Sequence, residues 1–82
     1  MISIFDVVTL MQDLPEKGLF AGMVGTLLDI YTKPVLAYEV EFCDVSGRTI
    51  EQLALLLGQL KLATDAEIQA RRAQSQEDRP ST

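Results

Sequence analysis

The chain has 82 residues, with 12 acidic and 7 basic side chains, a formal net charge of −5 and no histidine. This length predicts a single small domain of marginal stability, and a single cysteine excludes an internal disulfide. Histidine is the commonest general base and a common zinc ligand, so we expect no enzyme, no metal site and no cofactor. Self-association remains as a way to stabilise so small a fold.

Membrane and nucleic-acid partners are also not expected. The longest uncharged run, 18–28, contains three glycines and is far shorter than the roughly 20 apolar residues that span a bilayer. The first residues lack the basic stretch of a secretory signal, so we expect a cytoplasmic protein. Residues 1–63 carry eight acidic and four scattered basic side chains, which leaves no basic stripe for DNA or RNA.

Short strands separated by turn signals account for the first half of the chain. The first predicted strand, 5–11, is rich in β-branched residues, and the loop after it contains Pro15, which does not fit a strand ladder. The second strand spans 24–31. At its entrance, Gly22 and Gly25 predict a tight turn with positive φ followed by a close approach of two backbone segments.

The clearest strand is 36–42, where apolar side chains alternate with alanine and glutamates in the manner of a half-buried strand. Residues 44–47 predict a hairpin loop with Gly47 in the left-handed position of a bulge. The chain then returns as a strand over 48–57, makes a short turn, and ends the sheet with a brief strand, 60–62.

A helix is predicted over 64–75. Thr64 and Glu67 have the spacing of a capping box, and Glu67 and Arg71 are placed for an ion pair one turn apart. A narrow stripe of alanines fits either an exposed helix or a seam packed against the sheet or a partner helix. We expect 76–82 to be a disordered tail.

These elements predict a mainly β fold, a small SH3-like barrel of about five strands over 1–63 with a short C-terminal helix. Four motifs spaced along the chain also resemble those of a known family: LPEKGL at 14–19, GMVGT at 22–26, YEVEFCD at 38–44 and GRT at 47–49. Together they resemble a bacterial family of short proteins, domain of unknown function 4926, over about residues 6–62. The resemblance implies an SH3-like barrel and no established biochemical activity.

The leucine-rich return strand predicts a partner-binding surface. Six leucines lie between residues 53 and 62, and strict alternation fails where three of them are consecutive. Neighbouring residues of a strand point to opposite faces of the sheet, so a core on one face can bury only every second leucine of that run. We expect the surplus apolar side chains to form a contact surface drawn from Val8, Leu53, Leu55, Leu56 and Leu57. The alternative is that the C-terminal helix folds back over them.

The other notable residues have structural interpretations. Gly22, Gly25 and Gly47 are expected to serve turn and backbone geometry, because a phosphate cradle needs cations or a helix N-terminus beside it. Glu39 and Glu41 share one face of their strand, where a solvated surface is expected in preference to a cation site or an acid–base pair.

The sequence therefore predicts a non-enzymatic protein-interaction module that self-associates as a homo-oligomer and binds another protein. No small-molecule ligand is indicated. Two alternatives stay open. The acidic surface suits an antitoxin or immunity-type inhibitor of a basic partner, because opposite charge speeds the encounter. A small barrel of this kind also suits an accessory subunit of a larger enzyme complex.

Overall fold

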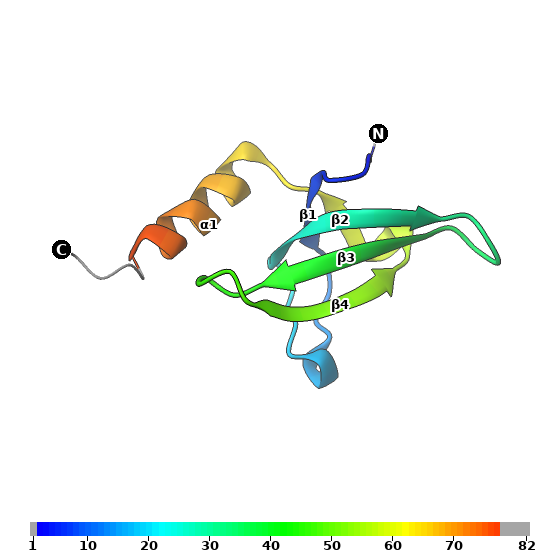
Figure 1. The fold of residues 1–82 in the computed structure, drawn as a ribbon, viewed down its shortest axis with the longest axis horizontal. Coiled ribbons are helices and arrows are strands. Elements are labelled where there is room, and N and C mark those ends of the chain that lie inside the picture. Colours follow the sequence, from blue (N-terminus) through cyan, green and yellow to red (C-terminus); the bar gives the residue numbers. More distant parts are fainter. Residues whose placement is uncertain (1, 78–82) are drawn as a thin grey trace.

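The computed structural model describes residues 2–77. Five antiparallel strands form one open sheet in the order β4-β3-β2-β1-β5, so that β4 and β5 are its two edges (Figure 1). The strands are β1 (Val7–Leu10), β2 (Val24–Tyr31), β3 (Ala37–Cys43), β4 (Thr49–Leu55) and β5 (Leu60–Leu62). Helix α1 (Asp65–Glu77) and two 3-10 turns, η1 (Pro15–Lys17) and η2 (Leu57–Gln59), complete the described chain. The predicted mainly β fold with a C-terminal helix is confirmed.

Two long hairpins make up most of the sheet. In the β2–β3 hairpin, Gly25 lies opposite Phe42, and in the β3–β4 hairpin, Tyr38 lies opposite Leu55. The β3–β4 register slips by one residue at the hairpin end of β4. Strand β1 lies between β2 and β5, with Val8 opposite both Gly25 and a residue of β5. These pairings direct one face of each strand toward a common interior.

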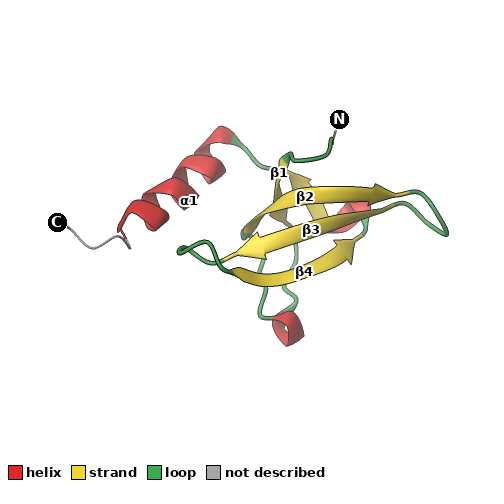
Figure 2. Ribbon diagram, viewed as in Figure 1, coloured by secondary structure: helices red, strands yellow, loops and turns green. Residues whose placement is uncertain are grey.

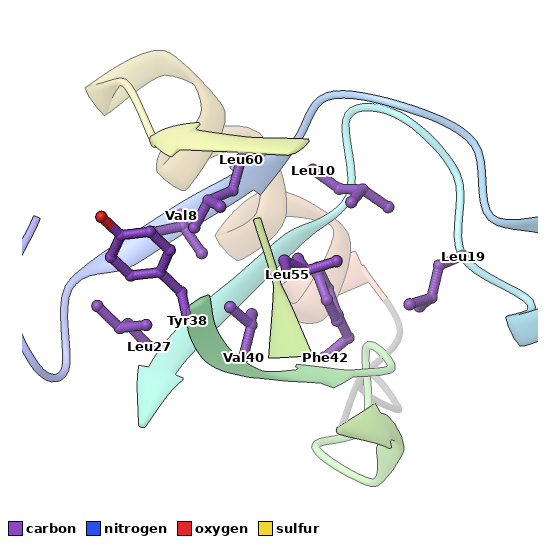
Figure 3. Packing of buried hydrophobic residues seen from close by; sticks show 9 residues of the cluster. All are labelled: Val8, Leu10, Leu19, Leu27, Tyr38, Val40, Phe42, Leu55 and Leu60. Carbon is purple, nitrogen blue, oxygen red and sulfur yellow. The ribbon is translucent and has the colours of Figure 1, made fainter. Parts of the chain in front are cut away.

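The core consists of one set of apolar side chains on that interior face (Figure 3). Tyr38, Val40 and Phe42 are buried along β3, and the residues between them are only half-buried, as the predicted alternation requires. The full set of buried apolar residues is Val8, Leu10, Leu19, Leu27, Tyr38, Val40, Phe42, Leu55 and Leu60. Every strand contributes to it, and Leu19 comes from the long loop between β1 and β2.

The first strand and the return strand are both shorter than predicted, and the largest difference in each has a local backbone reason. The first strand begins at Val7 and not at residue 5, because Phe5 adopts a left-handed φ of 71° that interrupts an extended chain. The return strand ends at Leu55 and not at residue 57, because the 3-10 turn η2 begins at Leu57. The second and last strands begin and end where the pattern placed them.

The capping box at the start of α1 is confirmed by two reciprocal hydrogen bonds. The Thr64 amide donates to Glu67 Oε1 at 2.8 Å, and the Glu67 amide donates to Thr64 Oγ1 at 3.1 Å. The helix continues through Glu77, two residues beyond the predicted end, and residues 78–82 of the expected tail lie outside the described chain. Figure 2 shows α1 projecting from one end of the sheet.

The predicted ion pair between Glu67 and Arg71 is not formed. Glu67 lies 3.5 Å from Lys61 Nζ, and the Arg71 guanidinium donates instead to the Val24 carbonyl at 2.7 Å. This contact ties the helix to the entrance of β2, across 47 residues of sequence.

Candidate functional site

The three predicted glycines serve backbone geometry. Gly22 and Gly47 have φ values of 96° and 90°, which side chains other than hydrogen strongly disfavour. Gly25 has a different role. A Cβ atom there would lie 2.7 Å from the Glu41 carbonyl oxygen and 2.8 Å from a Val40 methyl group. The predicted turn followed by a close backbone approach is therefore confirmed.

Two residues of the predicted partner surface belong to the core. Val8 and Leu55 are 0% and 1% exposed, so placing them on a contact surface was wrong. Leu55 lies opposite the buried Tyr38 in the β3–β4 pairing, and both side chains point to the interior face of the sheet. Val8 lies in a strand flanked on both sides, by β2 and β5. Leu53 is half-buried and packs against the same core.

The next two leucines leave the core and face solvent. Leu56 is 52% exposed and Leu57 is 54% exposed. The tight turn η2 causes this change, because the Leu56 amide donates to Gln59 Oε1 at 2.8 Å and its carbonyl accepts the Gln59 amide at 2.9 Å. Turn geometry replaces strand alternation here, and both side chains point outward.

Helix α1 does not cover these leucines. Figure 1 shows α1 at one end of the sheet, and the β2–β3 hairpin and the end of β4 toward the other end. The alternative that the helix folds back over the leucine run is therefore wrong. The helix instead approaches β2 near Val24.

Other exposed apolar residues lie at the same end of the sheet. Because Tyr38 lies opposite Leu55, the ladder brings Leu36 and Val35 to the end where β4 finishes. The N-terminal segment does not lie at that end, because the Phe5 amide donates to the carbonyl of Leu27, midway along β2, at 2.7 Å. We use the name apolar end for the exposed residues Val35, Leu36, Leu56 and Leu57.

Phe5, which lies outside the apolar end, is 73% exposed. An aromatic residue with positive φ is held in an uncommon backbone conformation, and such outliers are concentrated at functional sites. Sequence reasoning missed Phe5, because no local pattern distinguishes a left-handed phenylalanine from the first residue of a strand.

A groove of about 560 Å³ lies at the opposite end, between α1, the start of β2 and the β3–β4 hairpin. Its lining includes Met23, Val24 and Ile50, the half-buried thiol of Cys43, and Arg71. The Arg71 guanidinium was not predicted to be there. Only its position on the helix, four residues after the capping glutamate, could have suggested that it faces the sheet.

Acidic side chains occupy the outer face of β2 and β3. Asp29 lies directly opposite Glu39, and Glu41 lies on the same outer face two residues further along β3. Glu39 accepts a hydrogen bond from Gln52 at 3.1 Å. Desolvation and the nearby carboxylates of Glu39 and Asp29 raise the pKa of Tyr31.

Two other carboxylates are stabilised in their charged form. Hydrogen bonds from the Ser46 hydroxyl and the Arg48 amide lower the pKa of Asp44 in the β3–β4 loop. The Thr64 amide in the capping box is the largest influence that lowers the pKa of Glu67. Both groups are therefore anionic at neutral pH, and both are engaged in local structure.

The described part of the chain contains no cluster of three metal-ligating side chains. No helix within residues 2–77 combines the length and hydropathy needed to cross a bilayer.

Comparisons with curated proteins and with solved structures give no match. The family model described as Domain of unknown function (DUF4926) matches residues 4–62, which include all five strands. The chain therefore belongs to the DUF4926 family.

Proposed function

We propose that this protein is a non-enzymatic interaction module that self-associates through its apolar end. The observation that carries the proposal is the outward turn of Leu56 and Leu57 at η2, at the same end of the sheet as the exposed Val35 and Leu36. Single exposed apolar residues are ordinary on a protein surface, but a concentration of large ones at one end is typical of an interface.

The energetics support this assignment. Burying one exposed leucine side chain contributes about 1.5–3 kcal/mol. Several such side chains are enough to offset part of the free energy that association costs in lost translational and rotational freedom, about 4–15 kcal/mol. A small domain without a disulfide gains the most from such a contact.

Sedimentation velocity over a range of concentrations tests the proposal. We expect the wild-type protein to associate and Leu56→Glu to sediment as a monomer, because a carboxylate cannot be buried there without a partner. Phe20→Glu is the matched control, since Phe20 is also about half exposed but lies in the long loop after β1. A wild-type monomer at the highest concentration, or an unchanged Leu56→Glu assembly, contradicts the proposal.

A second candidate function is inhibition of a basic partner protein, of the antitoxin or immunity type. The supporting observation is the cross-strand pair of Asp29 and Glu39, two like charges placed directly opposite each other. Such a pair destabilises a sheet by about 0.2–1 kcal/mol, and a cationic partner would relieve the repulsion.

Co-purification from native cells tests this second candidate. We expect a basic protein to co-purify with the wild-type chain and to elute as the salt concentration rises. We expect the same protein to be absent when the Asp29→Asn/Glu39→Gln variant is used. Retention of a neutral partner, or of the same partner by the doubly substituted protein, contradicts it.

A further inference from the structure

We infer that two copies of this chain pair antiparallel along the free edge of β4, across a two-fold axis near Gln52, so that two five-stranded sheets become one. This inference rests on the proposed self-association and adds the β4 edge as its central contact, with the apolar end at the rim. Antiparallel pairing of a strand with its own copy is naturally two-fold, because each copy presents the same edge to the other.

The first argument is the exposed edge itself. β4 is the terminal strand of the sheet and, among the described residues, pairs only with β3. It has seven residues, whereas β5, at the other edge, has three and carries Lys61 at its centre. Proteins protect edge strands by keeping them short or by placing lysine or proline on them. β5 has that protection; β4 contains neither lysine nor proline, and the slip in its register is confined to its hairpin end.

The second argument is the charge on β4. Its exposed side chains, which include Ile50, Gln52 and Ala54, are uncharged, although β3 beside them carries Glu39 and Glu41. The one charged residue of β4, Glu51, lies 3.6 Å from Lys17 Nζ and is already paired. A second copy therefore meets an uncharged strand on a molecule whose net charge is −5.

The acidic face does not oppose this arrangement strongly. In the paired sheet, β3 of one copy and β3 of the other are separated by three strand spacings, about 14 Å. The Debye length at physiological ionic strength is about 8 Å, so repulsion between the two sets of glutamates is largely screened. Leu56 directly follows β4, so in this register it lies at the rim of the contact, opposite residue 48 of the other copy.

Disulfide trapping tests the geometry. Cys43 is first replaced by serine, and a single cysteine is introduced at position 52 (Gln52→Cys) or, as the matched control, at position 49 (Thr49→Cys). Directly opposed residues of antiparallel strands lie within disulfide reach, whereas two copies of residue 49 would be about 20 Å apart. We expect Gln52→Cys to form covalent dimers about tenfold or more faster than Thr49→Cys, on a non-reducing gel.

Charge substitution gives a second, non-covalent measurement. Gln52→Lys places two lysines opposite each other in the pair but beside Glu39 and Glu41 in the single copy, so the fold is retained. We expect its dimer dissociation constant to rise about threefold, and that of Thr49→Lys to stay unchanged.

The outcomes separate the two proposals. A wild-type monomer in sedimentation overturns both self-association and the β4 pairing. A wild-type dimer in which Gln52→Cys and Thr49→Cys cross-link equally slowly, or equally fast, overturns the β4 pairing and leaves association through another surface. Capture of a different protein's strand by Gln52→Cys, with no homodimer, also overturns it.

Discussion

At the scale of single residues, Gly25 is the position with the least tolerance for change. An added Cβ would collide with a Val40 methyl and with the Glu41 backbone oxygen, which cannot move without shifting β3. We expect Gly25→Ala to lower the free energy of unfolding by about 1–3 kcal/mol through overcrowding. Urea denaturation measures this, with Gly58→Ala as the control, because a Cβ at Gly58 meets no atom within 4 Å. Equal stability of the two variants contradicts the close-approach role.

Residue-level prediction from sequence succeeded where local chemistry decides conformation. Gly22, Gly47 and the Thr64–Glu67 capping box all rest on interactions within a few residues, and the structure has each of them. Phe5 and Arg71 were not predicted in their roles, because each is held by a carbonyl more than 20 residues away in sequence. Contacts of that range depend on the register of the sheet, which no short pattern encodes.

At the scale of elements, the β3–β4 hairpin depends on an ionised Asp44. Hydrogen bonds from Ser46 and Arg48 lower the Asp44 pKa below its unfolded value of 3.8, so its contribution to stability is present above that value. The contribution is lost as the pH falls through the still lower pKa of the folded state. We expect wild-type protein to lose more stability between pH 6 and pH 3 than Asp44→Asn does, in urea unfolding at each pH. Parallel losses contradict this linkage.

Strand parity explains what could and could not be predicted about the candidate surface. The number of leucines in the return strand correctly indicated that some must face outward, and Leu56 does. Which ones do so depends on where the strand ends. η2 ends it after Leu55, so Leu55 stays inside and Leu57 joins Leu56 outside. Val8 was misplaced because its side chain faces the interior and packs in the core cluster, and the β1 pattern does not show which face is inside.

At the scale of the whole molecule, two opposing forces act on any contact between copies. Each copy carries a net charge of −5, which repels a second copy, while the apolar end and the free β4 edge attract it. Salt screens the repulsion and does not weaken apolar burial. The sign of the salt response therefore distinguishes self-association from binding to a basic partner, which salt weakens.

We expect self-association to strengthen as sodium chloride rises from low to moderate concentration, because the repulsion is screened while the apolar contact persists. Lowering the pH toward the isoelectric point of about 4.4 should act in the same direction by reducing the net charge. Sedimentation velocity at fixed protein concentration measures both responses, and Leu56→Glu serves as the control that should stay monomeric throughout. Weakening by salt would mean that ion pairs hold the copies together, and the acidic face would then replace the apolar end as the contact surface.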